Sequence, residues 1–260
     1  MIVEILVPTW VSWLLRPLLF LGVFKRSHNS HWIKPGLDPM TLPKPVCDKV
    51  LVDKDKDGAY TDIRLECAII SQQRGCELFR FIVTYHFVAN GCMHVQYHAV
   101  PGHAIRTLPS LPRVGVSMTI DKSLYMMNYF GRGPHENYPD RKSSAAMGVW
   151  TASPEDMGYN YIVPGENGAR TGCEWVNFQS ADGKGFCIVW DRGEDDLLHL
   201  REQPARTEGA DSHFTFSASM YAQQELHVAT HSHHLDVREQ GKHPIHVNID
   251  HKILGLGDVV

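Results

Sequence analysis

The chain has 260 residues, of which 43% are hydrophobic and 21% are charged, a balance typical of one large or two small globular domains and not of a disordered protein. Its 25 Lys and Arg and its 29 Asp and Glu give a formal net charge of −4, so nothing favours nucleic acid or an anionic membrane as a partner. Six irregularly spaced cysteines do not form the pattern of a disulfide framework, which favours a reducing compartment and a cytoplasmic location.

Residues 1–45 are predicted to be a poorly specified lead segment. The apolar stretch within 1–24 has no positive charge before it and no small-residue cleavage site after it, unlike a signal peptide. A membrane helix would place Arg16-Pro17 near its middle, which is costly in lipid. We therefore expect no membrane association, with a signal anchor at 1–24 as the alternative. Four prolines within 28–45 mark the boundary to a domain predicted over 46–260.

From residue 46 onward the dominant hydrophobic period is two. Apolar and polar side chains alternate over 63–69, 79–87 and 93–99, as in strands with one face on a core and the other in solvent. Asn90-Gly91 separates the second and third of these runs and predicts a tight hairpin turn.

Further strands and one helix follow. Strand-like stretches cover 114–120, 125–130, 185–190, 213–217 and 245–250. Asp182-Gly183 supplies turn chemistry, and only 221–233 has a helical pattern. Because no parallel βαβ spacing occurs, the predicted fold class is all-β, an antiparallel sandwich of large sheets.

One acidic turn resembles half of a calcium loop. Asp53, Asp55 and Asp57 alternate before Gly58, as in the first half of that motif. The twelfth position is Arg64, where the motif requires a bidentate Glu, and both flanks are strand-like. We interpret the segment as a charged hairpin turn.

Histidines are concentrated in the last quarter of the chain, and two of them could share a helix face at i, i+4 spacing, His227 and His231. The group comprises His227, His231, His233, His234, His243, His246 and His251. Because no Cys or clustered carboxylate completes a ligand set, surface histidines are favoured over a metal site.

Two glutamates occupy turns whose sequence is strongly specified, Glu136 and Glu166. Each is followed by Asn and has Pro two residues before it. A glycosidase needs two such carboxyl groups, so a catalytic pair is one hypothesis. The alternative, which we favour, is that each glutamate pairs with an arginine, Arg141 or Arg170, in a partly buried network that fixes the turns. The structural candidates are therefore Glu136, Asn137, Arg141, Glu166, Asn167 and Arg170.

Other chemistries have less support. Trp150, Trp175 and Trp190 could stack on a sugar, but Trp in a β-sandwich more often belongs to the core. Neither a G-x-S-x-G elbow nor a phosphate-binding glycine loop is present.

Three blocks of sequence carry a resemblance to a known family. They are Asn128-Tyr-Phe-Gly-Arg-Gly-Pro-His-Glu-Asn-Tyr-Pro-Asp-Arg141, Tyr161-Ile-Val-Pro-Gly-Glu-Asn-Gly-Ala-Arg170 and Phe216-Ser-Ala-Ser-Met-Tyr-Ala-Gln-Gln-Glu-Leu226. In this order they resemble the small chain, the C-terminal domain, of the large bacterial-type β-galactosidases, over about 46–257. The resemblance implies an antiparallel supersandwich similar to that of galactose mutarotases.

The resemblance also implies a division of labour. In that family, retaining hydrolysis of β-galactosides such as lactose uses two Glu with bound magnesium and sodium on a separate barrel domain, and nothing in this chain resembles that barrel. The resemblance therefore implies no catalytic residue, metal or other cofactor in this chain. It implies two partners, a β-galactosidase large chain carrying the barrel and a galactoside substrate.

Further implications concern the sugar site and the ends of the chain. Arg113 and Gly115 match the family segment that leads into a mobile loop near the sugar, with Gly115 as its pivot. The family block that precedes a sugar-stacking Trp is matched through 255–258, and the sequence stops at Val260. The resemblance thus implies a small-chain domain clipped at both ends.

The resulting interpretation is a subunit or fragment that completes the active-site wall and assembly of a glycoside hydrolase. A stand-alone carbohydrate-binding or mutarotase-like protein and a non-functional fragment remain as alternatives.

Overall fold

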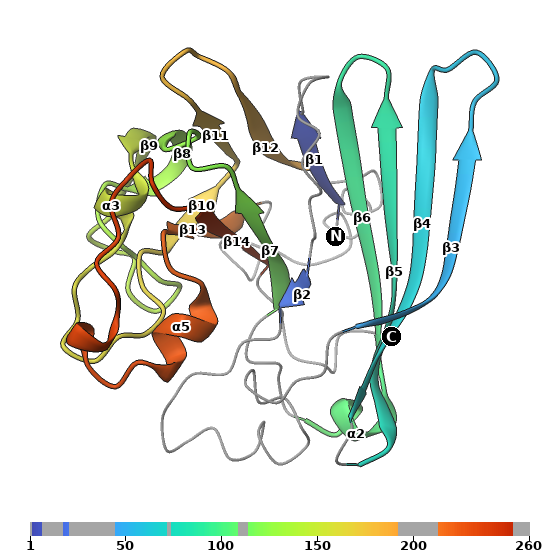
Figure 1. Ribbon diagram of the computed structural model, residues 1–260, viewed down its shortest axis with the longest axis horizontal. Coiled ribbons are helices and arrows are strands. Elements are labelled where there is room, and N and C mark those ends of the chain that lie inside the picture. Colours follow the sequence, from blue (N-terminus) through green and yellow to red (C-terminus); the bar gives the residue numbers. More distant parts are fainter. Residues whose placement is uncertain are drawn as a thin grey trace, which may run out of the picture.

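The computed structural model describes residues 45–71, 74–108, 114–191 and 213–251, and the backbone alone of 2–6 and 18–20. These residues form two β-sheets in which every pair of adjacent strands is antiparallel. Figure 1 shows the long strands of one sheet at one side of the molecule and two short helices, α3 (Pro154–Met157) and α5 (Gln223–Val228), at the other. The prediction of an all-β antiparallel sandwich is confirmed.

The larger sheet has nine strands in the order β3-β4-β5-β6-β1-β12-β11-β8-β9. Their bounds are β1 (Ile2–Leu6), β3 (Val46–Lys54), β4 (Tyr60–Ser71), β5 (Cys76–Val88), β6 (Cys92–Pro101), β8 (Met126–Gly133), β9 (Ala146–Ala152), β11 (Trp175–Gln179) and β12 (Gly185–Asp191).

The smaller sheet has five strands in the order β10-β13-β14-β7-β2. They are β2 (Leu18–Phe20), β7 (Val114–Ile120), β10 (Arg170–Cys173), β13 (Phe214–Ser219) and β14 (Ile245–His251). Short helical segments connect the strands, namely α2 (His103–Arg106), α3 (Pro154–Met157), α5 (Gln223–Val228) and the 3-10 turn η1 (Ser232–His234).

The meander β3–β6 follows directly from the period-two pattern. Its registers align Val50 with Leu65, Leu65 with Val83 and Val83 with Tyr97 in one row across the sheet. Val83 and Tyr97 are buried, whereas Val50, on the edge strand, is 58% exposed. The inward face therefore loses its cover toward β3.

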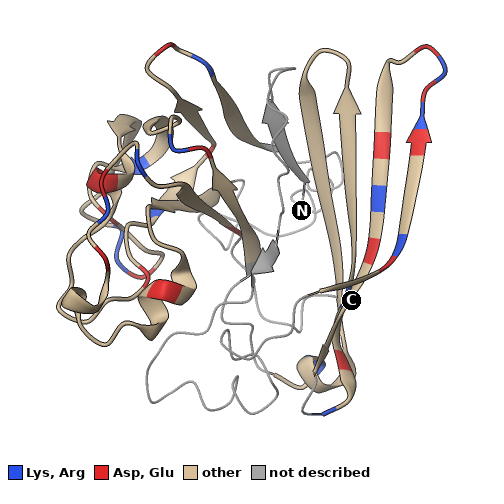
Figure 2. Cartoon of the chain, in the orientation of Figure 1, with Lys and Arg blue, Asp and Glu red and all other residues tan. Residues whose placement is uncertain are grey.

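The turns of this meander match their sequence signals. Gly91, with φ of 91°, closes the β5–β6 hairpin through its N–H to the carbonyl of Val88. The acidic segment between β3 and β4 is a hairpin turn, as predicted, because Asp55 accepts the N–H of Gly58 on its carbonyl and that of Ala59 on Oδ2. Figure 2 shows the charged residues of both signs along β3, β4 and their connecting turn.

The predicted lead segment contributes backbone to both sheets. Residues 2–6 pair with β6 on one side and β12 on the other, and 18–20 pair with β7. The hydrophobic period had indicated no strand there. Residue 46, where the domain was expected to begin, is the first residue of β3, and the domain boundary itself stays a prediction.

Aromatic side chains join the two sheets in a common core. Tyr129 of β8 meets Phe216 of β13 edge to face, with ring centroids 5.1 Å apart. Within the large sheet Phe178 stacks on Phe186 at 5.3 Å. All four rings are buried, and burial of such large apolar surfaces is the dominant source of stability in a sandwich.

The helix predicted over 221–233 is shorter in the structure. It ends at Val228, and Ala229 adopts an extended conformation as its C-cap. His231 is also extended, with φ of −144°, so His227 and His231 do not share a helix face.

The six cysteines are free thiols. Within the described ranges, no helix combines the length and apolar character needed to cross a membrane.

Candidate functional site

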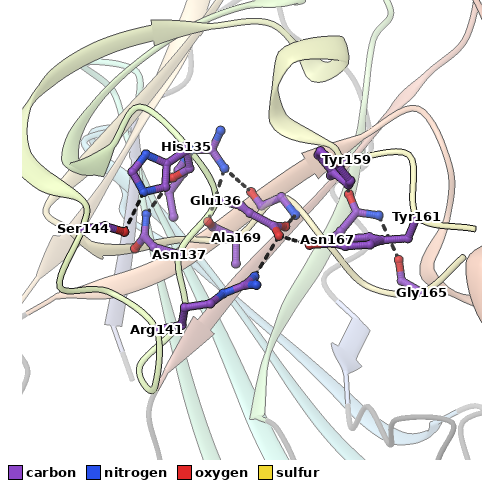
Figure 3. Close-up of polar contacts among 12 residues, drawn as sticks. His135, Glu136, Asn137, Arg141, Ser144, Tyr159, Tyr161, Gly165, Asn167 and Ala169 are labelled. Carbon is purple, nitrogen blue, oxygen red and sulfur yellow. Dashed lines mark hydrogen bonds and ion pairs between the residues drawn. The ribbon is translucent and has the colours of Figure 1, made fainter.

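The two glutamate-containing turns lie against each other at one end of the sandwich. The first follows β8, and the second connects α3 to β10; Figure 3 shows their polar contacts. Here the sequence departs from strand periodicity, and the structure replaces strand pairing with side-chain hydrogen bonds.

Asn137 fastens the first turn to β10. Its Nδ2 donates to the carbonyls of Arg132 and His135, both at 3.0 Å. Its Oδ1 accepts from the backbone N–H of Thr171 at 3.0 Å and from the Thr171 hydroxyl at 2.6 Å. The residue is fully buried, so these four bonds satisfy an amide that would otherwise be costly inside the protein.

Glu136 links the first turn to the second. Its Oε1 accepts from Arg141 Nη2 at 2.8 Å and from the hydroxyl of Tyr161, and its Oε2 accepts from the backbone N–H of Gly168 at 2.9 Å. The Glu136 side chain is 14% exposed, against 60% for Arg141. Both carboxylate oxygens are therefore occupied by donors from within the domain.

The electrostatics favour the ionised carboxylate. Burial is the largest single influence and by itself raises the pKa of Glu136, but the Gly168 amide, the Tyr161 hydroxyl and Arg141 together outweigh it, so the pKa is lowered. The hydrogen bond to Glu136 is the main cause that raises the pKa of the Tyr161 hydroxyl, which stays protonated as the donor. A carboxylate held ionised in this way is not suited to act as a general acid.

Asn167 and Gly168 shape the second turn. Asn167 Oδ1 accepts the N–H of Tyr159 at 3.1 Å, and its Nδ2 donates to the carbonyl of Gly165 at 3.0 Å. Gly168 has φ of +79°, and a Cβ there would lie 2.6 Å from the carbonyl oxygen of Met157. Both the backbone conformation and the packing therefore require glycine at this position.

Arg170 is buried and bonded to one hydroxyl and two carbonyl groups. Its guanidinium is 1% exposed and donates through Nε to the hydroxyl of Tyr129 at 3.1 Å, and through Nη1 to the carbonyls of Gly168 and Ala169 at 3.1 and 3.3 Å. The negative charge of Glu166 acts on Tyr138, whose pKa is raised first by burial and then by Glu166 and Glu136. The expected ion pair of Glu136 with Arg141 is formed, and that of Glu166 with Arg170 stays a prediction.

Of the two residues expected near the sugar, Arg113 and Gly115, the structure describes only Gly115. Arg113 lies outside the described residues. Gly115 lies within β7, paired with Asp250 of β14 and Phe20 of β2. A Cβ on Gly115 would come within 2.4 Å of the Asp250 carboxylate and of the Ile249 carbonyl, so close packing explains the glycine. Its function as a pivot remains a prediction.

Two further groups considered from the sequence are a tryptophan, Trp150, and the exposed histidines around η1. Trp150 packs against the core and donates its indole N–H to the carbonyl of Gly131 at 3.1 Å, as expected of a core residue. The rings of His231, His233 and His234 lie within 5.7 Å of one another between centroids. Across the described ranges, no group of three or more His, Cys, Asp or Glu is arranged to hold a metal ion.

Sequence reasoning missed three residues of the network, Tyr129, Tyr161 and Thr171. The hydroxyl groups of Tyr161 and Thr171 donate to Glu136 and Asn137, respectively. The hydroxyl of Tyr129 accepts from Arg170. Tyr129 and Tyr161 stand inside the quoted blocks, so a search for partners of the motif's charged groups could have proposed them. Thr171 directly follows the second block.

These observations define the class of protein. Within the described residues, the protein is an antiparallel β-sandwich domain whose polar motif is held together by hydrogen bonds within the domain.

The chain belongs to the β-galactosidase small chain family, whose sequence profile matches residues 25–259.

The β-galactosidases that match this chain are much longer than the segment that matches. The chain is 36% identical over 152 residues to the β-galactosidase of Pseudoalteromonas haloplanktis, which covers 58% of this chain and 12% of that protein. It is 34% identical over 188 residues to the β-galactosidase of Enterobacter cloacae, a match that covers 72% of this chain and 15% of that protein. It is 44% identical over 85 residues to the β-galactosidase of Klebsiella pneumoniae strain 342, a match that covers 33% of this chain and 8% of that protein. The chain therefore spans only about 8 to 15% of the length of these relatives.

Proposed function

We propose that this chain acts as the small-chain part of a β-galactosidase. In this proposal it completes the active-site wall and the assembly of a glycoside hydrolase, while the acid and the nucleophile belong to the rest of the enzyme. The family match supports the proposal, and so does the fact that the relatives contain several times more protein than the matched segment.

The observation that carries the proposal is the state of Glu136. A retaining glycosidase needs a carboxylate free to attack the sugar and a second carboxyl group that holds a proton. Glu136 is ionised and bound by three donors of its own domain. The contacts of Glu136 therefore suit a structural function, and the catalytic groups are assigned to the partner.

The partner and its ligands follow from the same proposal. The partner is a β-galactosidase large chain with a barrel domain, the substrate is a terminal β-galactoside such as lactose, and magnesium and sodium bind to the barrel. The free cysteines of this chain support a reducing, cytoplasmic location.

A complementation assay tests the proposal. The purified chain is mixed with the remainder of the Enterobacter cloacae β-galactosidase, expressed without the segment that matches this chain, and hydrolysis of a chromogenic galactoside is followed. We expect no turnover from either polypeptide alone and turnover from the mixture. Turnover by the isolated chain would show that it contains its own catalytic groups. An inactive mixture, together with galactose binding by the isolated chain in calorimetry, would favour a stand-alone carbohydrate-binding protein.

A further inference from the structure

A short loop between α3 and β10 exposes an unusual amount of apolar surface. Four of its five residues are large and apolar, and their exposed fractions are 64% for Tyr159, 36% for Tyr161, 79% for Ile162 and 51% for Val163. Single exposed apolar residues are ordinary on protein surfaces, but a contiguous group often marks an interaction site. We refer to residues 159–163 as the apolar loop.

The apolar loop is held at Tyr159 and Tyr161 by residues of the two glutamate-containing turns. Asn167 accepts the N–H of Tyr159, and the carboxylate of Glu136 accepts the hydroxyl of Tyr161, as Figure 3 shows. The N–H of Tyr161 also bonds the Tyr159 carbonyl at 2.9 Å.

A third attachment comes from the C-terminal part of the chain. The N–H of Ser232 in η1 donates to the carbonyl of Ile162 at 3.1 Å. The rings of Tyr159 and Tyr161 are 4.8 Å apart between centroids. The loop is thus held at the Tyr159 N–H, the Tyr161 hydroxyl and the Ile162 carbonyl, while the side chains of Ile162 and Val163 remain exposed.

Such an arrangement is suited to binding. Ordering a loop and its side chains on association costs free energy, and a loop that is already held in place avoids much of that cost. Tyrosine and branched apolar side chains presented on a fixed backbone are also the kind of anchor that dominates interface energetics.

We propose that the apolar loop is the docking element by which this domain binds the remaining polypeptide of a β-galactosidase. This inference rests on the proposed function. The occupant is indicated by length, because the matched segment is only 12–15% of the Pseudoalteromonas and Enterobacter enzymes, and the rest of such an enzyme must bury part of this domain's surface.

Residues of the two glutamate turns position the apolar loop. Glu136 and Asn167 lie beneath the loop and hold Tyr161 and Tyr159 in position. In this view Glu136 is a positioning residue for assembly, and its carboxylate does not contact substrate.

The test is the variant Ile162→Asp, titrated against the Enterobacter remainder with galactoside hydrolysis as the readout. Val237→Asp is the matched control, because Val237 is 92% exposed and lies outside the apolar loop. For Ile162→Asp we expect the concentration giving half-maximal activity to rise about tenfold or more, as for loss of an interface anchor. At saturation kcat and KM should equal those of the wild-type chain, and Val237→Asp should titrate like the wild type. Urea unfolding checks that both variants fold.

The outcomes separate the two proposals. If the wild-type chain complements and Ile162→Asp titrates identically, the docking inference is wrong and the proposed function stands. If the wild-type chain self-associates in sedimentation and Ile162→Asp abolishes only that, the occupant is a second copy and the inference is also overturned. If the wild-type chain neither binds nor activates the remainder, the proposed function fails and the docking inference fails with it.

Discussion

The β3–β6 meander and the junction of the two glutamate turns differ in where their polar side chains lie. In the meander they point away from the core, and at the junction some of them are buried. In the meander, polar side chains such as Arg64 and Thr84 alternate outward, while the partners of Val83 form an apolar interior. At the junction, Asn137 and Arg170 are themselves buried, and each also bonds a distant segment, Asn137 to Thr171 of β10 and Arg170 to Tyr129 of β8. The meander is therefore stabilised by apolar burial and tolerates polar exchange, whereas the junction depends on the geometry of individual hydrogen bonds.

The sharpest way to test this contrast is to remove one asparagine from each region. Asn137→Ala should lower the free energy of unfolding by about 4 kcal/mol, because four buried hydrogen bonds of about 1 kcal/mol each are lost. Asn90→Ala, in the β5–β6 turn, removes one exposed bond to the Cys92 N–H and should cost about 1 kcal/mol or less. Urea denaturation measures both. Equal losses would contradict the distinction between the two regions.

A pair of glycines separates backbone strain from packing. Gly168 and Gly183 have almost the same φ, +79° and +78°, but only Gly168 has a neighbouring carbonyl where a Cβ would be placed. Gly168→Ala should cost about 3 kcal/mol, from strain and overpacking together, and Gly183→Ala about 1 kcal/mol from strain alone. Thermal and urea unfolding provide the values. A Gly183→Ala loss as large as that of Gly168→Ala would show that the Met157 contact is unimportant.

Two valines in one cross-strand row test how far the core of the meander extends. Val83 is 2% exposed and Val50 is 58% exposed on the same face of the sheet. Val83→Ala should cost about 2 kcal/mol for two buried methyl groups, whereas Val50→Ala should cost less than about 0.5 kcal/mol. If Val50→Ala proves as destabilising as Val83→Ala, the edge strand is covered in solution.

The smallest expected effect is also the one with a pH signature. Glu136→Gln should cost about 1 kcal/mol at neutral pH, because the amide keeps the shape of the side chain but loses the charge that strengthens its hydrogen bonds. The pKa of Glu136 is lowered from 4.5 in the folded chain, so its ionised form stabilises the fold above about pH 4.5 and this contribution is lost as the pH falls through the folded pKa.

The measurement is the difference in free energy of unfolding between wild type and Glu136→Gln at pH 7 and near pH 3. The difference should shrink toward zero in acid. Glu77→Gln, in the exposed ion pair with Arg80 on β5, is the control and should change stability less at every pH. A Glu136→Gln variant that folds normally, binds its partner and yet abolishes turnover would instead indicate a catalytic carboxylate.

Most strands could be predicted because their cause is local. The stretch expected over 114–120 is β7, and the alternation over 79–87 and 93–99 lies within β5 and β6. The helix was overestimated, since a pattern of residue types does not show that Ala229 and His231 become extended once they leave the last turn. Strand β1 was not predicted because its strand partners, β6 and β12, lie about 90 and 185 positions away along the chain. Pairing with such distant strands is a tertiary effect that the local residue pattern does not show.

The site was predictable in its members and only partly in its contacts. Glu136 with Arg141 could be anticipated because they are five positions apart in one turn, and the structure places Arg141 Nη2 2.8 Å from Glu136 Oε1. The partner of Arg170 could not, because Tyr129 is 41 positions away on another strand. Nor could sequence show that Glu136 holds Tyr161, which connects the motif to the exposed surface beside it.

The order of apolar and polar residues was enough by itself to make this an antiparallel β protein with hairpins at its Asn-Gly and acidic turns, since alternation and turn chemistry act between neighbours along the chain. The tertiary structure alone decided that the motif's buried polar groups satisfy one another across three segments, and that the apolar loop they hold faces solvent. Hydrogen bonds between distant segments depend on the position of each donor and acceptor in space, which the spacing of residues along a chain does not specify.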